Sequence, residues 1–158
     1  MSQLTSQRIA QLVIEALERT AFVLAEPVDA ERAAELSAVT CFSRIFYTGP
    51  DQGQLFLAAS EGFVRELVAS LLGVEPEDVD PASQGQDAIK ELANIVGGST
   101  ILALSGADCQ YSLNLPELVE APEMPEPGER GAACFVESEG ELLKVIWRPS
   151  DPSRSAAA

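Results

Sequence analysis

Two hairpin patterns constrain the fold of this chain more than any other feature of its sequence. Residues 39–47 and 54–59 are rich in β-branched and aromatic residues, and the segment 48–53, Thr-Gly-Pro-Asp-Gln-Gly, has the composition of a tight turn. Residues 132–137 and 141–148 repeat this arrangement around the turn Ser-Glu-Gly. Because strands joined by such short turns pair antiparallel, the sequence predicts an antiparallel sheet.

Three amphipathic helices accompany the predicted strands. The first covers about residues 5–24, the second lies between an N-cap at Ser60 and a C-terminal Gly73, and the third covers 83–104 with a capping box, Ser-x-x-Gln, at its start. Each carries apolar residues at the spacing of one helical face, which we expect to be buried. The predicted buried faces are Ile9, Leu12, Val13, Ala16 and Leu17 in the first helix, Phe63, Val64, Leu67, Val68, Leu71 and Leu72 in the second, and Ile89, Leu92, Ala93 and Val96 in the third.

The order of these elements predicts the fold class. Helix, hairpin and helix are followed by helix, strand (110–115) and hairpin, which is a loose internal two-fold repeat. This order predicts an α+β domain, an antiparallel sheet with long helices packed on one face. We expect a single domain over residues 1–148 and a disordered tail over 149–158. The Glu- and Pro-rich segment 116–130 is expected to be a surface loop, and its role stays open.

The composition excludes several classes of function. Ten Lys and Arg against 25 Asp and Glu give a net charge of −15, so we expect no binding to nucleic acid or to an anionic membrane. The chain has no histidine, which excludes Ser-His and Cys-His nucleophile pairs and imidazole metal ligands. Cys41, Cys109 and Cys134 lie far apart, so neither a disulfide framework nor a zinc site is expected. Neither a signal-peptide core nor a membrane-spanning stretch is found, and we expect a cytoplasmic protein.

The third predicted helix carries the residues that could do chemistry. At about 100° per residue, Asp87, Glu91, Asn94 and Gly98 fall roughly 140–200° from Ile89, on the face opposite the apolar stripe. That face offers a carboxylate, then an amide, then a position without a side chain. Another molecule could therefore approach the helix closely while Glu91 and Asn94 reach into that molecule.

Two simpler explanations of this face stay open. Glu and Asn on the outer face of a helix are most often only solvated. Gly97 and Gly98 would each destabilise a continuing helix by about 1 kcal/mol relative to Ala, and they could serve close packing against another helix. Such a penalty in the middle of a helix is nonetheless typical of functional sites.

The segment Asp87–Gly98, D-x-x-x-E-x-x-N-x-x-x-G, resembles the D/S-x-x-x-E-x-x-N signature of the CheC/CheX/FliY family of chemotaxis phosphatases. The order of elements over residues 5–148 is also similar to that family. The first helix offers only the segment Glu15–Glu18, with glutamate where the amide would be needed and no glycine after it. With one complete site, the chain is most similar to the CheX members, and Glu15 and Glu18 are expected to be solvated.

This resemblance implies an enzyme and a mechanism. Members of the family hydrolyse the aspartyl-phosphate of a CheY-like response regulator. By the resemblance, Asn94 would orient the attacking water, Glu91 would pair with a lysine of the regulator's pocket, and Asp87 and Gly98 would support the site. The regulator would hold the Mg²⁺, so this chain would bind no cofactor or metal itself. Which regulator is the partner, how the activity is regulated and whether the pathway is chemotaxis stay open.

The resemblance also bears on assembly. CheX-like proteins pair through their sheets, which implies a homodimer. The hairpin 132–148 is apolar on both strand faces, so one face would need a second cover. The alternative to a phosphatase is a non-catalytic binding module of the same fold that docks or sequesters a response regulator or a flagellar switch component.

Overall fold

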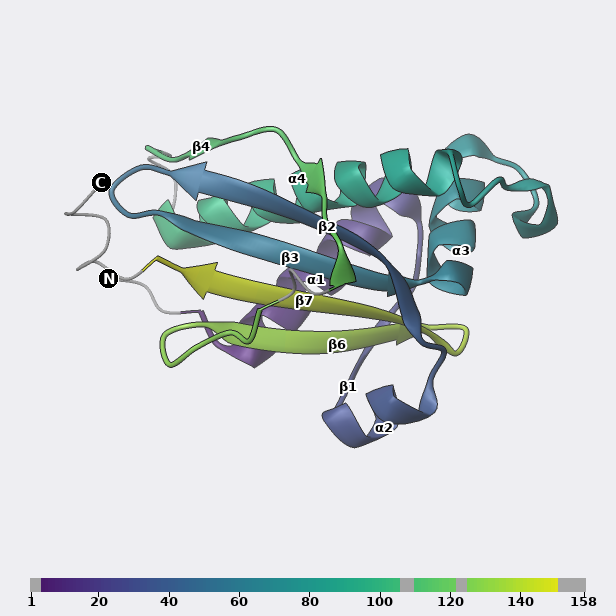
Figure 1. Ribbon diagram of the computed structural model, residues 1–158, viewed down its shortest axis with the longest axis horizontal. Coiled ribbons are helices and arrows are strands. Elements are labelled where there is room, and N and C mark those ends of the chain that lie inside the picture. Colours follow the sequence, from purple (N-terminus) through teal and green to yellow (C-terminus); the bar gives the residue numbers. More distant parts are fainter. Residues whose placement is uncertain (1–3, 106–109, 122–124, 151–158) are drawn as a thin grey trace.

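The computed structural model describes residues 4–105, 110–121 and 125–150 (Figure 1). The helices are α1 (Ser6–Ala21), α2 (Ala30–Glu35), α3 (Glu61–Leu72) and α4 (Gln84–Ser105), with a short 3-10 helix, η1 (Pro76–Asp78). The strands are β1 (Glu26–Val28), β2 (Val39–Thr48), β3 (Gly53–Ser60), β4 (Ser112–Leu113), β5 (Glu117–Leu118), β6 (Ala132–Ser138) and β7 (Glu141–Pro149).

These strands form one antiparallel sheet of seven strands, which confirms the predicted fold class. The order is β1-β6-β7-β3-β2-β4, and the short β5 pairs with another part of β2. Both predicted hairpins are present, β2–β3 and β6–β7, and pairing of β3 with β7 joins them in the centre of the sheet. The second hairpin turns at Glu139 and Gly140, whose φ angles are both positive (52° and 79°).

Helices α1, α3 and α4 lie on one face of the sheet, as predicted (Figure 1). The predicted apolar faces of α1 and α4 are buried throughout. In α3 the prediction is wrong for the last turn, because Leu71 and Leu72 are 40% and 57% exposed. That turn faces the first turn of α4 across an open groove instead of packing against the sheet.

The opposite face of the sheet is partly covered by the same chain. In Figure 1 the described residues just before β6 pass in front of the sheet. Phe56 and Ile146 point to this face and are 3% and 0% exposed, so they need no second subunit as cover. Trp147 belongs to the core, where its Nε1 donates a hydrogen bond to Tyr47 Oη (3.0 Å). Three phenylalanines of the outer face stay half-buried: Phe42, Phe46 and Phe135.

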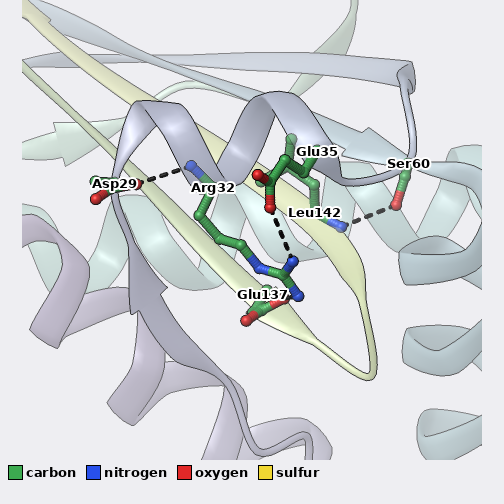
Figure 2. A network of polar contacts seen from close by, with 6 residues as sticks. All are labelled: Asp29, Arg32, Glu35, Ser60, Glu137 and Leu142. Atoms are coloured by element: carbon green, nitrogen blue, oxygen red, sulfur yellow. Dashed lines mark hydrogen bonds and ion pairs between the residues drawn. The ribbon is translucent and has the colours of Figure 1, made fainter.

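Two short elements, β1 and α2, lie in a segment for which the sequence analysis predicted no structure. Asp29 caps α2 by accepting a hydrogen bond from the Arg32 N–H (2.8 Å), and the Arg32 guanidinium contacts both Glu35 and Glu137 at 3.2 Å (Figure 2). The contact with Glu137 attaches α2 to β6. Elements of three and six residues leave too little apolar periodicity to be predicted.

Ser60 connects helix α3 to the sheet. Its hydroxyl accepts hydrogen bonds from the N–H groups of Phe63 (3.4 Å) and Leu142 (3.0 Å), and it donates to Glu141 Oε2 (2.7 Å). The contact with Leu142 is drawn in Figure 2. The predicted N-cap is therefore confirmed, and the same side chain also fixes the start of α3 against β7.

Several predicted boundaries differ from the structure. Helix α1 ends at Ala21, because Phe22 takes a left-handed conformation (φ 56°). The predicted capping box is wrong: Ser83 Oγ donates to Asp80 Oδ2 (2.9 Å), and Gln84 Oε1 accepts from the Asp80 N–H (2.8 Å). The strand predicted at 110–115 is reduced to β4, and the predicted loop 116–130 contains β5.

The end of the chain is ordered slightly beyond the predicted domain. Pro149 belongs to β7, and the Ser150 N–H donates to the Gln52 carbonyl (2.8 Å). Residues 151–158, the remainder of the predicted tail, lie outside the described residues.

Candidate functional site

Helix α4 presents the candidate site because its opposite side is fixed in the core. Ile89, Leu92, Ala93 and Val96 are each no more than 1% exposed. Burial of such a stripe fixes the rotation of the helix, so every residue on the other side must face solvent. Asp87, Glu91 and Asn94 are exposed and Gly98 is half-buried. The structure thus places the four candidate residues on one outer face. We call these four residues the motif face.

Glu91 and Asn94 are unengaged within the protein. Across residues 4–105, 110–121 and 125–150, neither side chain makes a hydrogen bond or an ion pair. Asp87 differs, because its Oδ1 lies 3.9 Å from Lys90 Nζ, in a pair that is largely solvated. Such exposed pairs add little to stability. The carboxylate of Glu91 and the amide of Asn94 are therefore available to a partner without breaking any contact of the fold.

The two adjacent glycines have different surroundings. A Cβ at Gly97 would lie 3.1 Å from Leu113 Cδ2 and 3.2 Å from Ile45 Cγ2, so this glycine allows α4 to pack closely on β2 and β4. The helix–helix packing considered from the sequence is therefore wrong for Gly97, because the close neighbours belong to strands. A Cβ at Gly98 would meet nothing within 4 Å. Packing against the described residues does not explain Gly98.

An open groove separates the last turn of α3 from the first turn of α4, and we call it the α3–α4 groove. Its volume is about 250 Å³. Its lining consists of Val68, Leu71, Leu72, Gln84, Asp87, Ala88 and Glu91. The two helices approach closely next to it, since a Cβ at Gly85 would lie 2.6 Å from Val64 Cγ1. The groove thus adjoins the motif face and shares Asp87 and Glu91 with it.

The corresponding face of α1 offers no second site. Glu15 and Glu18 are exposed, as expected for a solvated face. An amide can donate a hydrogen bond, but the ionised glutamate that stands at the corresponding position of α1 can only accept one. The outer face of α1 therefore lacks the Glu-x-x-Asn pair that the motif face carries.

Two of the three cysteines lie in the described part of the chain, and the structure supports no chemistry for either of them; Cys109 lies outside the described residues. Cys41 is half-buried and Cys134 is buried, and burial raises the pKa of the Cys134 thiol to about 12. A thiol that stays protonated at neutral pH is a poor nucleophile. Within the described part of the chain, no group of three or more Cys, Asp or Glu side chains is placed to hold a metal. Nor does that part contain a helix long and apolar enough to cross a membrane.

The fold and the motif face together define an α+β protein that displays a Glu-x-x-Asn pair on a helix packed against an antiparallel sheet. Comparison with known families agrees with this fold. The family model described as chemotaxis phosphatase CheX matches residues 41–136, more than half of the chain, including all of α4. The chain therefore belongs to the CheX family. No curated protein sequence matches it.

Solved structures of the family share the fold. Chemotaxis protein CheX from Desulfovibrio desulfuricans superposes with a TM-score of 0.67 at 15% identity, covering 92% of this chain and 98% of that one. CheX from Vibrio vulnificus gives 0.69 at 15% identity, covering 90% and 93%. The CheX–CheY–BeF3–Mg²⁺ complex from Borrelia burgdorferi gives 0.65 at 12% identity, covering 95% and 100%. At these identities the likeness establishes the fold alone.

Proposed function

We propose that the chain is a phosphatase that hydrolyses the aspartyl-phosphate of a CheY-like response regulator. The observation that carries this proposal is the pair of exposed, unengaged side chains Glu91 and Asn94, next to the open Gly98, in a member of a chemotaxis phosphatase family. The Borrelia burgdorferi relative was solved in complex with CheY, which supports a CheY-like partner.

In this proposal Asn94 orients the attacking water. The phosphoryl group lies on the regulator, so this chain must bring a water molecule in line with the phosphorus–oxygen bond that breaks. Phosphoryl transfer depends mainly on such positioning and on neutralising charge. An amide offers one acceptor and two donors, so it can hold a water in a fixed orientation without a change of protonation state. The absence of histidine is therefore compatible with this reaction.

Glu91 has a docking role in this proposal. Its carboxylate would pair with the lysine of the regulator's phosphorylation pocket, one helical turn from the amide. Asp87 would support the site from the first turn of α4, where a negative charge also interacts favourably with the helix dipole. Gly98 would leave space for the regulator's surface. The Mg²⁺ of the reaction would be held by the regulator, and this chain would contribute no ligand to it.

Replacement of Asn94 by alanine tests the mechanism. Since Asn94 is exposed and makes no hydrogen bond or ion pair among the described residues, Asn94→Ala should change the free energy of unfolding by less than about 0.5 kcal/mol. Turnover should fall by on the order of 10²-fold, as is typical when one positioned polar group is removed from a reacting centre. Phosphate release from a phosphorylated regulator, measured beside a binding titration, gives both values. Wild-type turnover in Asn94→Ala would show that the site is wrongly assigned.

The alternative function is a non-catalytic module that docks or sequesters a response regulator or a flagellar switch component. The two functions differ in stoichiometry. A phosphatase present at a small fraction of the regulator concentration dephosphorylates the whole pool, whereas a sequestering module acts only in proportion to its own amount. The unengaged amide of Asn94 favours the phosphatase, because docking alone does not need a water-orienting group.

We further propose a cytoplasmic homodimer, on the family resemblance. The half-buried Phe42, Phe46 and Phe135 on the outer face of the sheet would form the contact. The central residues of that face do not require a dimer contact, since Ile146 is already buried within a single chain. Light scattering at micromolar concentration tests this point, and a monomer at all concentrations would contradict it.

A further inference from the structure

One wall of the α3–α4 groove is apolar and the other is acidic. Leu71 and Leu72 form one wall and are 40% and 57% exposed. Asp87 and Glu91 form the other wall on α4, and the Asp87 side chain is 85% exposed. The other apolar residues of α3 are buried, so two adjacent leucines left half in water at its end require an explanation.

The requirements of the fold do not explain these two leucines. Helix α3 ends at Gly73 in a left-handed conformation, and the N–H of Val74 donates to the Ala69 carbonyl (3.1 Å). This type of helix end is accompanied by an apolar contact from the residue after the glycine, which accounts for Val74. It does not involve Leu71 or Leu72. The helix end would form equally well with polar residues at those positions.

We infer that the α3–α4 groove is a second part of the regulator-docking surface, which receives an apolar side chain of the regulator next to a cationic one. The inference rests on the proposed function, because Glu91 lines the groove and also belongs to the motif face. A regulator whose lysine reaches Glu91 must lie over the adjoining leucines. Apolar side chains in such a contact supply affinity, and the flanking charges supply specificity.

Charge decides against a second copy of this chain as the occupant. The edge of the groove is acidic, so two copies that docked through it would bring Asp87 and Glu91 of both chains together. A free small molecule also fits poorly, because about 250 Å³ in an open groove is below the usual volume of ligand pockets, roughly 300–1,000 Å³. A protein surface that presents a basic side chain next to an apolar one complements both walls, the acidic wall on α4 and the apolar wall on α3.

The test is Leu72→Ser, with Leu24→Ser as the matched control. Leu24 is 73% exposed and lines a different hollow, together with Phe22 and Ser70. The probe is a set of CheY-type receiver domains from the organism that encodes this chain, each loaded with Mg²⁺ and beryllofluoride. We expect Leu72→Ser to weaken binding of the cognate domain about tenfold, which is about 1.4 kcal/mol. Leu24→Ser should bind like the wild type.

Turnover separates this inference from the proposed function. With phosphorylated regulator, Leu72→Ser should raise KM about tenfold and leave kcat unchanged, whereas Asn94→Ala should lower kcat. If Leu72→Ser binds and turns over like the wild type, the inference is overturned while the phosphatase assignment stands. If the wild type binds in a Leu72-dependent way without releasing phosphate, the inference stands and the phosphatase assignment fails. If no receiver domain binds the wild type, both are overturned.

Discussion

Gly98 offers a test in which stability and function should change in opposite directions. The glycine lies within the 22-residue helix α4, and a Cβ added there would meet nothing within 4 Å. Gly98→Ala should therefore gain the full helix-propensity difference, about 1 kcal/mol in the free energy of unfolding. For a domain of this size that gain raises Tm by about 2–4 °C.

Function should suffer from the same methyl group. It would stand on the motif face beside Asn94, and a displacement of about 1 Å at a reacting centre can lower a rate on the order of 10²-fold. We expect phosphatase activity of Gly98→Ala to fall by about tenfold or more. Thermal unfolding and phosphate release on the same preparation measure the two effects.

Gly97→Ala is the matched control, because it has the same propensity gain in a closed environment. Its methyl group would lie 3.1 Å from Leu113 Cδ2 and 3.2 Å from Ile45 Cγ2, and overpacking of this kind destabilises by about 1–3 kcal/mol. Gly97→Ala should thus be less stable than Gly98→Ala and keep its activity while folded. A Gly98→Ala protein that is more stable and fully active would refute the close approach of a partner. Loss of stability in Gly98→Ala would refute the argument that Gly98 has open space.

The remaining predictions concern charge. Glu91→Lys should weaken binding of the regulator much more than Glu18→Lys, measured by titration, because only Glu91 lies on the motif face; equal effects would indicate long-range repulsion alone. At physiological salt the chain should not be retained on DNA or anionic vesicles, given its net charge of −15; salt-sensitive retention would contradict this. Burial raises the pKa of Glu66, although a hydrogen bond with Ser138 opposes the shift. Because the pKa is raised in the folded state, ionisation of Glu66 at pH 7 destabilises the folded protein relative to the unfolded chain. Glu66→Gln should therefore raise Tm at pH 7 and leave Tm unchanged below the pKa of Glu66 in the unfolded chain. A lower Tm at pH 7 would refute that.

The motif face could be predicted from the sequence because it depends on a single local periodicity. Once Ile89 and the rest of the apolar stripe are assigned to the core, the geometry of the helix places Glu91 and Asn94 in solvent. The continuity of α4 through both glycines followed from the apolar residues after them. The different surroundings of Gly97 and Gly98 could not be predicted, since they depend on where Leu113 and Ile45 lie.

The α3–α4 groove escaped prediction for a physical reason. The apolar period of α3 continues through Leu71 and Leu72, and such a pattern indicates which side of a helix is apolar but not whether something covers it. Cover depends on the angle at which α4 meets α3, which in turn depends on the close contact at Gly85. A similar limit applies to β1 and β5, which are positioned by pairing with distant strands, and to α2, which the Arg32–Glu137 contact attaches to β6.

A site on the outside of a helix is what the proposed reaction requires. In aspartyl-phosphate hydrolysis on a partner protein, the phosphoryl group already lies in a pocket of that partner. A deep pocket on the phosphatase could not reach this group, so the phosphatase must instead present side chains that project into the partner's pocket. A hollow of about 730 Å³, whose lining includes Gln54, Arg130 and Arg148, shares no residue with the motif face. The fold supplies a long helix whose buried side holds it rigid, and in the proposed reaction this rigidity would place one projecting amide accurately on the partner.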